Sequence, residues 1–507
     1  MLSPPYFRIL TYVSWAFVAA WISLPGVSSA IERVSVAANG NEVAGYFFVT
    51  DVTPDGRYVV FAYSLDDLVP GDSNGKSDVF VLDRDDGSIE LISVNSNEVQ
   101  PTGVDGGSSN GTISNDGRYV AFESKSAELV LNDTNGLVDV FVRDRQTTNT
   151  ARVSLSNGGM QITGNSRGSI SGSGNFVVFQ SDGDDAVTGD TNTEQDVFRR
   201  DLVNQDTIRV SISDVEMEAI YPFGGSFSPS ISDDGNRIGF LSGAENLVAD
   251  DDNGHQDMFV RDVADGTTTR VSLTSTGAQQ ENGGCNETAV ISANGLTVAF
   301  ASSADNLVPG DNNGLTDVFV REIGSTSLEI VSVATGSTTF ITDGFTSFPT
   351  ISPDGRYVGF WSRSTQLDPR HVNGAFHGYI HDRQSKRTET INISTTGQFA
   401  DNASVFDSSS EAPIFASGGV YVFTSSSDEL VPGDTDETND VYQSAYIPAV
   451  SAAPAVNNSV LCASLKNKLK KLKKKAKRLK KSGKKAKAKK LKKKMKKIKK
   501  QLKALGC

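Results

Sequence analysis

The chain has 507 residues, enough for a large core or several domains. Charged residues make up 21% and hydrophobic residues 37%, the balance of a folded globular protein rather than of a disordered chain. The net charge of −13 hides an asymmetry, because 24 of the 48 Lys and Arg residues lie within residues 462–507, which contain no Asp or Glu. Residues 1–461 therefore carry 24 basic against 61 acidic residues, an acidic body attached to a basic tail.

Residues 1–30 have the pattern of a secretory signal peptide. Arg8 is their only charged side chain, an apolar run covers residues 9–22, and small residues at 28–30 provide a cleavage site. The run is short for a spanning helix, which needs about 20 residues; an uncleaved anchor is the alternative. No other stretch is apolar enough to cross a bilayer. We expect an exported protein in the periplasm, at the cell surface or outside the cell, where disulfides are permitted.

Residues 31–445 consist of a repeat of about 60 residues, clearest between residues 289 and 332. Alternating apolar and polar residues, bounded by Asn, Asp and Gly clusters, are typical of short strands joined by turns. This pattern predicts four strands, at residues 289–292, 296–302, 318–321 and 327–332. Each repeat should therefore form one four-stranded antiparallel sheet.

Seven repeats are marked by the glycine of the turn before the second strand. These glycines are Gly56, Gly117, Gly174, Gly235, Gly295, Gly355 and Gly418. Five residues after each glycine stands a phenylalanine: Phe61, Phe122, Phe179, Phe240, Phe300, Phe360 and Phe423. Three residues after each stands Val59, Val120, Val177, Ile238, Val298, Val358 or Tyr421. Because residues two apart share one face of a strand, we expect these pairs to form the core between the sheets of a seven-bladed β-propeller.

The fourth strand predicts how the ring closes. Its sequence motif occurs six times, at residues 91–94, 152–155, 209–212, 270–273, 330–333 and 390–393. The seventh repeat ends without it, and the missing copy stands at residues 33–36, directly after the signal. We expect the N-terminal strand to complete the last blade, since a closed ring protects sheet edges; an open array is the alternative.

The repeats resemble those of TolB-like β-propellers, relatives of the WD-type propeller. The similarity lies in the sequence SPDGRYV at residues 352–358, its counterparts at 53–57 and 114–118, and the DVFVRD strand at 139–144. It covers about residues 31–445 and is specific for the fold. It implies an exported binding scaffold; some such propellers are fused to peptidase domains, but here only a linker and a lysine-rich tail follow.

An acidic loop of the form D-x-N-G-x-x-D precedes the third strand of most repeats. Four loops match this form, with the candidate ligands Asp72, Asn74 and Asp78; Asp133, Asn135 and Asp139; Asp251, Asn253 and Asp257; and Asp311, Asn313 and Asp317. Two more are close to it, with Asp190, Asn192 and Asp196, and with Asp434, Asp436 and Asp440. Oxygen ligands at positions one, three and seven suit Ca²⁺. Asp and Asn also form side-chain turns that need no metal, and these loops lack the late Glu of an EF-hand, so both interpretations stand.

The sixth repeat departs from this pattern, with His371, Asn373 and His377 in the loop and His381 beyond it. Histidines near carboxylates suit zinc, and the alternative is a decayed loop with solvated histidines. No serine sits on a strand-to-helix elbow of the G-x-S-x-G type, and there is no phosphate-binding glycine loop. Abundant carboxylates leave open a glycosidic or lyase site in the central channel.

Residues 446–461 form a linker, and residues 462–507 a lysine-rich tail. Apolar residues are spaced alternately four and three apart at Leu465, Leu469, Leu472, Ala476 and Leu479, and again at Leu491, Met495, Ile498, Leu502 and Leu505. This spacing predicts two helices with a coiled-coil seam, broken at residues 482–483. We expect a helical hairpin closed by a Cys462–Cys507 disulfide, with Cys285 free. The alternative is a disordered polybasic tail.

These patterns predict a monomeric propeller that binds a protein or a cell-envelope polymer on its loop face. The cationic tail should associate with an anionic surface, and no span should remain in a membrane once the signal is cleaved. A carbohydrate-active or hydrolytic enzyme with carboxylates in the channel is the alternative. The two differ in whether carboxylates converge near a central pocket.

Overall fold

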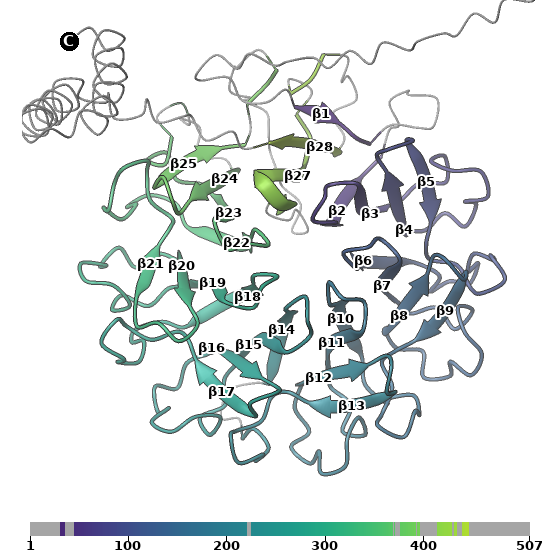
Figure 1. The fold of residues 1–507 in the computed structure, drawn as a ribbon, viewed down its shortest axis with the longest axis horizontal. Helices are drawn as coiled ribbons and strands as arrows, with labels where there is room; N and C mark the ends of the chain where they lie inside the picture. Colours follow the sequence, from purple (N-terminus) through teal and green to yellow (C-terminus); the bar gives the residue numbers. More distant parts are fainter. Residues whose placement is uncertain are drawn as a thin grey trace, which may run out of the picture. The chain divides into compact units, whose positions relative to one another are not determined.

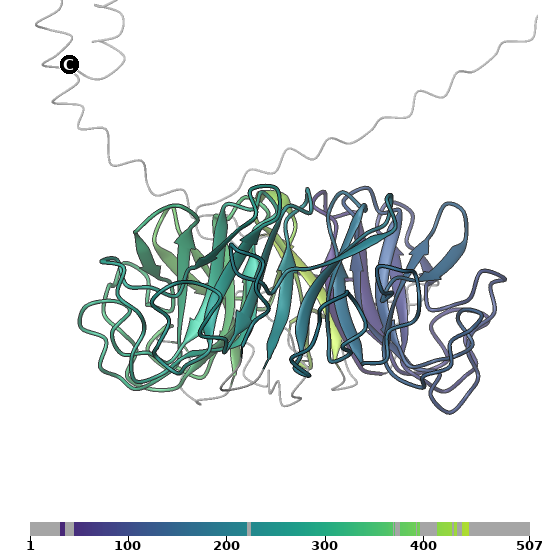
Figure 2. The ribbon, with the colours of Figure 1, turned by 90° about the horizontal axis from the view of Figure 1, so that it is seen from below.

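The computed structural model describes residues 31–35, 45–220, 225–368, 370, 376–391, 393–395, 413–427, 430–432 and 439–445. The predicted signal peptide, linker and tail lie outside these residues. The described part falls within one compact unit, Ser28–Ile447. It contains seven four-stranded antiparallel sheets arranged in a ring (Figure 1), with the strands running between its two faces (Figure 2). The predicted seven-bladed all-β propeller is confirmed.

The first three blades follow the ring in chain order. Blade 1 consists of β2 (Phe47–Val52), β3 (Tyr58–Tyr63), β4 (Asp78–Asp83) and β5 (Ser88–Leu91). Blade 2 consists of β6 (Ser108–Ile113), β7 (Tyr119–Ser124), β8 (Asp139–Asp144) and β9 (Asn149–Arg152). Blade 3 consists of β10 (Ser166–Ile170), β11 (Phe176–Ser181), β12 (Asp196–Asp201) and β13 (Asp206–Arg209).

The remaining blades complete the circle. Blade 4 consists of β14 (Ser226–Ile231), β15 (Arg237–Ser242), β16 (Asp257–Asp262) and β17 (Thr267–Arg270). Blade 5 consists of β18 (Cys285–Ile291), β19 (Thr297–Ser302), β20 (Asp317–Glu322) and β21 (Leu328–Ile330). Blade 6 consists of β22 (Thr346–Ile351), β23 (Tyr357–Ser362), β24 (His377–Asp382) and β25 (Arg387–Thr390). Blade 7 consists of β26 (Ile414–Phe415), the 3₁₀ turn η1 (Ser417–Gly419), β27 (Val420–Ser425), β28 (Asp440–Ala445) and β1 (Glu32–Arg33).

The innermost strand is the element that the sequence pattern placed least well. In blade 5 it begins at Cys285, four residues before the predicted start. The pairing of β18 with β19 shifts register between Asn286 and Ala289, a β-bulge, and similar shifts occur in blades 1, 2, 4 and 6. A bulge interrupts the two-residue alternation by which a strand is recognised, so the predicted strand stopped at the bulge.

Adjacent blades are held together by the predicted apolar core. Val120 and Phe122 of blade 2 are fully buried and cluster with Val60 and Val79 of blade 1. Within each blade the repeated phenylalanine also stacks on an aromatic ring of the third strand, as Phe122 does on Phe141 at 5.6 Å between ring centroids. The apolar residues three and five positions after each turn glycine therefore form the contact between blades, as predicted.

In six of the seven blades a serine of the fourth-strand motif ties the outer strand to the end of the acidic loop. Ser93 Oγ donates a hydrogen bond to Asp78 Oδ1 at 2.5 Å, and the Asp78 side chain is completely buried. The same bond joins Ser154 to Asp139, Ser211 to Asp196, Ser272 to Asp257, Ser332 to Asp317 and Ser35 to Asp440. The last pair is made between residues from opposite ends of the chain.

The N-terminal strand closes the ring as predicted. β1 pairs antiparallel with β28, with Glu32 opposite Gln443, and Val34 N–H donates to Val441 O at 2.8 Å. Arg33 lies 3.5 Å from the buried carboxylate of Asp440. Among the described residues, no helix has the length and apolar character needed to cross a bilayer.

Deleting residues 31–36 should lower the melting temperature and expose the edge of β28 to aggregation. The deletion removes the buried side chains of Ile31 and Val34, each worth roughly 1.5–3 kcal/mol, besides the bond to Asp440. Thermal melting and light scattering of the full and deleted proteins measure the effect. An unchanged transition without new aggregation would contradict closure by this strand.

Candidate functional site

The acidic loops are described in full in blades 1 to 5, where each joins the second strand to the third. In blade 1 the backbone N–H of Ser73 in the loop donates to Gln100 Oε1, from the segment that leads to blade 2, at 3.0 Å. Loops and inter-blade segments thus share one face, as predicted, and the tight glycine turns lie on the other. Asp434 and Asp436 lie outside the described residues.

The asparagine of the loop makes the hydrogen bonds of a turn. Asn74 Nδ2 donates to Asp78 Oδ2 at 2.9 Å, and Asn74 Oδ1 accepts the N–H of Lys76 at 2.8 Å. The asparagine oxygen accepts the N–H two residues on in the other four loops as well, at Asn135, Asn192, Asn253 and Asn313. The oxygen expected at position three of a metal site is therefore already used by the backbone turn.

The two aspartates of each loop lie together, and in blade 1 a glutamine amide joins them. Asp72 and Asp78 are both buried, and Gln100 Nε2 donates to Asp72 Oδ1 at 2.7 Å and to Asp78 Oδ2 at 2.8 Å. Burial raises the pKa of Asp78 to about 6, against the hydrogen bonds that lower it.

In blades 2 to 4 an arginine from the end of the fourth strand occupies the same place. Arg152 Nη1 lies 3.3 Å from Asp133 and 3.6 Å from Asp139. The corresponding contacts are 3.1 and 3.4 Å for Arg209 with Asp190 and Asp196, and 2.6 and 3.6 Å for Arg270 with Asp251 and Asp257. A guanidinium thus supplies the positive charge that a metal ion would bring to these loops.

Blade 3 adds a third carboxylate. Oxygens of Asp190, Asp196 and Glu218 lie within 4.8 Å of one another, a donor set that could hold a metal. Arg209 Nη1 contacts all three, at 2.8 Å from Glu218. Burial, with the adjacent charge of Asp196, raises the pKa of Asp190 to about 7. A metal here would have to displace the guanidinium or share the carboxylates with it.

Blade 5 keeps both aspartates and has neither donor. Ile330 stands in the place of the arginine and Phe340 in that of the glutamine. Asp311 and Asp317 are buried, and Asp311 Oδ1 accepts no hydrogen bond. This is the one fully described acidic loop whose aspartates are not bridged by an arginine or a glutamine.

The histidines of blade 6 do not fit the alternative of a solvated, decayed loop. His377 and His381 are both buried, and His381 Nδ1 lies 2.8 Å from Thr388 Oγ1. Burial lowers the pKa of His381 to about 4, so the ring is neutral at pH 7. Four residues along one strand separate the two rings by roughly 13 Å, too far for one zinc ion. His371 and Asn373 lie outside the described residues.

Cys285 is a free, buried thiol on β18, and burial raises its pKa well above the usual range. A buried, protonated thiol is unreactive toward oxidants and metals. This agrees with the prediction that Cys285 stays unpaired. The proposed Cys462–Cys507 disulfide lies outside the described residues.

Two carboxylates, of half-buried Asp51 and buried Glu123, were missed by the sequence reasoning. Asp51 on β2 accepts the N–H of Ile113 on β6 at 2.8 Å, and burial raises its pKa to about 7. Glu123 on β7 accepts from Asn110 at 2.9 Å and from the N–H of Gly168 at 3.2 Å, and burial raises its pKa to about 7. Both join the inner strands of adjacent blades. They resemble ordinary alternating polar residues in the sequence, which gave no signal for them.

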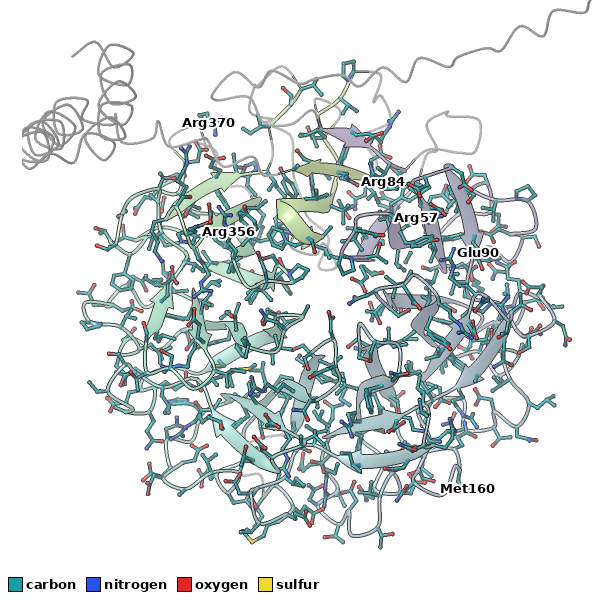
Figure 3. The ribbon with its side chains drawn as sticks, viewed as in Figure 1. Arg57, Arg84, Glu90, Met160, Arg356 and Arg370 are labelled. Atoms are coloured by element: carbon teal, nitrogen blue, oxygen red, sulfur yellow. The ribbon has the colours of Figure 1, made fainter. Side chains whose placement is uncertain are left out.

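Two cavities lie between blades. One of about 560 Å³ separates blades 5 and 6 on the turn face, with Glu329 and Arg383, 3.1 Å apart, in its wall beside Arg356. The other, of about 740 Å³, lies at the loop face between the acidic loop of blade 2 and the segment that leads to blade 3, and is lined by Leu131 and Met160. Figure 3 shows Met160 at the outer rim of the ring, and Arg57 and Glu90 in blade 1.

Replacing Glu123 by Gln should flatten part of the pH dependence of stability. The folded carboxyl keeps its proton up to about pH 7 and the unfolded one loses it near 4.5, so its contribution to stability falls as pH rises through this window. The loss should be on the order of 1–3 kcal/mol. Gln180 stands at the matching position of blade 3, where its Oε1 accepts the N–H of Ser228, so the variant should fold. Urea unfolding at pH 5 and pH 8 measures the slope; a variant with the wild-type slope would contradict the assignment.

Among known proteins, the chain is similar only in fold to the solved structures named below. No family model and no curated protein matches the chain. Similar solved structures include an oligogalacturonate lyase from Vibrio parahaemolyticus, with 12% identity and a TM-score of 0.48 over 83% of this chain and 96% of that one. TolB from Acinetobacter baumannii has 13% identity and a TM-score of 0.35 over 69% and 64%. The propeller domain of the Trilobed protease from Pyrococcus furiosus, described as having an open velcro topology, has 10% identity and a TM-score of 0.46 over 80% and 94%.

Proposed function

We propose that the protein is an exported propeller scaffold that binds a protein or a cell-envelope polymer on its loop face. The observation that supports this is a row of exposed apolar side chains on that face. Val99, Met160 and Met217 precede the equivalent residues Gln100, Gln161 and Glu218 of successive inter-blade hairpins, and each is more than half exposed. Exposed apolar side chains held at regular intervals on a rigid ring suit an extended partner.

Calcium forms the second part of the proposal. Carboxylates at matching loop positions are retained in every fully described loop, which favours a shared role, while arginines in blades 2 to 4 supply the charge internally. Calcium binding is accordingly proposed for loops without such an arginine. A bound ion would stabilise the ring by mass action.

The tail forms the third part. Its 24 basic residues, with no acidic or aromatic residue among them, suit unspecific electrostatic binding to an anionic surface such as an envelope polymer, phospholipid head groups or extracellular nucleic acid. Without an aromatic residue, the tail has no side chain on which a nucleic-acid base could stack.

An enzyme working in the channel remains the alternative, and one observation favours it. Asp51 and Asp233, from blades 1 and 4, lie close enough for the charge of Asp233 to raise the pKa of Asp51 further. Both carboxylates, however, accept hydrogen bonds from blade 2: Asp51 from the N–H of Ile113 at 2.8 Å, and Asp233 from Asn115 at 2.7 Å. Turnover of a carbohydrate polymer that disappears in Asp233→Asn but persists in Met160→Asp would favour the enzyme over the scaffold.

If the loop face binds a partner, replacing its exposed apolar side chains by charged ones should abolish that binding. Met160→Asp combined with Met217→Asp should abolish capture of an envelope component from a membrane and cell-wall extract. Val203→Asp is the matched control, because Val203 is equally exposed but lies in the β12–β13 turn on the opposite face. Equal capture by all three proteins would argue against this face.

The tail proposal predicts that truncation after residue 461 removes binding to vesicles of phosphatidylglycerol and phosphatidylcholine, but leaves loop-face capture intact. Binding by the full chain should weaken in salt, since exposed charges are screened within about 10 Å at 0.1 M. Sedimentation with vesicles measures both effects. Binding that survives truncation would place the anion-binding surface on the propeller.

A disulfide in the tail should make it more helical. Closing a loop of about 45 residues between Cys462 and Cys507 is worth roughly 4 kcal/mol through the unfolded state. Circular dichroism of the oxidised and reduced proteins tests this, and an added polyanion should raise helicity in both. Peptide mapping that links Cys285 to a tail cysteine would overturn the hairpin.

A further inference from the structure

We infer that the acidic loop of blade 5 is a dedicated Ca²⁺ site, formed by Asp311 and Asp317, and that it differs in this from the four other loops described in full. The inference rests on the calcium part of the proposed function and narrows it to one blade. The loop joins β19 to β20 (Figure 1). The five loops differ in the side chain that lies between their two aspartates.

The first missing donor is the arginine at the end of the fourth strand. The register of the third and fourth strands places Arg152 opposite Phe141, Arg209 opposite Phe198 and Arg270 opposite Phe259. The same register places Ile330 opposite Phe319 in blade 5. An isoleucine therefore occupies the position from which a guanidinium reaches the aspartates in blades 2 to 4.

The second missing donor is the side-chain amide of the inter-blade hairpin. In the five loops that the structure describes in full, the asparagine Nδ2 donates to the carbonyl of the residue after this position: Pro101, Ile162, Ala219, Gln280 or Ile341. The preceding residues are Gln100, Gln161, Glu218, Gln279 and, in blade 5, Phe340. Both polar positions have thus become apolar in one blade, while its two aspartates and asparagine are retained.

The result is a buried pair of carboxylates without a bridging side chain. Asp317 is fully buried and accepts bonds from Ser332 at 2.6 Å and Asn313 at 2.9 Å. Asp311 is 8% exposed, and its Oδ1 is buried and accepts no hydrogen bond. Asp311 is held by the backbone N–H of Asn313, and no side chain bridges it to Asp317. Burying two carboxylates together without a bridging donor is unfavourable, and a bound cation would offset that cost.

A cation between the two carboxylates would take the place that the arginine occupies in blades 2 to 4. Carboxylate oxygens with open coordination positions suit Ca²⁺, which accepts irregular geometry and completes its shell with backbone carbonyls and water. The small exposed fraction of Asp311 gives the ion access from solvent.

Calorimetric titration of the full-length protein with CaCl₂ at pH 7.5 tests the site. Ile330→Arg places the guanidinium of blades 2 to 4 in blade 5 and should lower the number of bound ions by one, with no loss of thermal stability in EDTA. Asp311→Asn should weaken the same site by about tenfold or more, because ligand charge sets calcium affinity. Asp251→Asn is the matched control, because Asp251 has the same position in blade 4, where Arg270 bridges the two aspartates. It should leave the number of bound calcium ions unchanged.

The outcomes separate this inference from the wider proposal. Calcium uptake that is equal in wild type, Ile330→Arg and Asp311→Asn would overturn the blade 5 site while leaving calcium binding elsewhere. No uptake by wild type at millimolar Ca²⁺ would overturn both. Neither result bears on loop-face capture, which Met160→Asp tests. If Ile330→Arg fails to fold, the affinity of Asp311→Asn decides alone.

Discussion

The bond between the fourth-strand serine and the last aspartate of the acidic loop is the constraint on which the rest of the ring depends. It buries a carboxylate completely in each blade where it occurs, as at Ser93 and Asp78. A buried carboxylate must have its oxygens satisfied, and one serine satisfies only Oδ1. Oδ2 therefore needs further donors, which explains why the asparagine, and in blades 1 to 4 a second polar side chain, recur with the aspartate.

This requirement gives the acidic motif a structural role that needs no metal. Asn74 and Gln100 complete the shell of Asp78 in blade 1, and arginines do the equivalent in blades 2 to 4. The donor to Oδ2 differs from blade to blade while the aspartates do not. The fold therefore tolerates different donors at this position. A blade could lose the side-chain donor altogether and bind an ion in its place, as we infer at Asp311.

Much of the fold could be predicted because its signals are local. The turn glycines predicted the second strand of all seven blades. The copy of the fourth-strand motif at residues 33–36 correctly predicted the strand that closes the ring. The bulges were missed because they break the alternation that identifies strands. The arginines were visible as the first letter of the fourth-strand motif, but a strand-end residue gives no sign that its side chain reaches back to a loop some 20 positions earlier, as Arg209 does to Asp190. His381 was misjudged because burial is a property of the packed ring.

The closing strand makes in blade 7 the same serine–aspartate bond that is found in blades 1 to 5, here between residues far apart in the sequence. Ser35 and Arg33 meet Asp440 as Ser154 and Arg152 meet Asp139, although some 400 residues separate the first partners and about 15 the second. Contacts of such long sequence separation form late, because the loop they close is costly in entropy. Until then β28 has an unpaired edge and Asp440 lacks its serine and arginine. The seventh blade should therefore be the least stable part of a partly folded ring, and the N-terminal strand brings the polar partners of Asp440 as well as a strand edge.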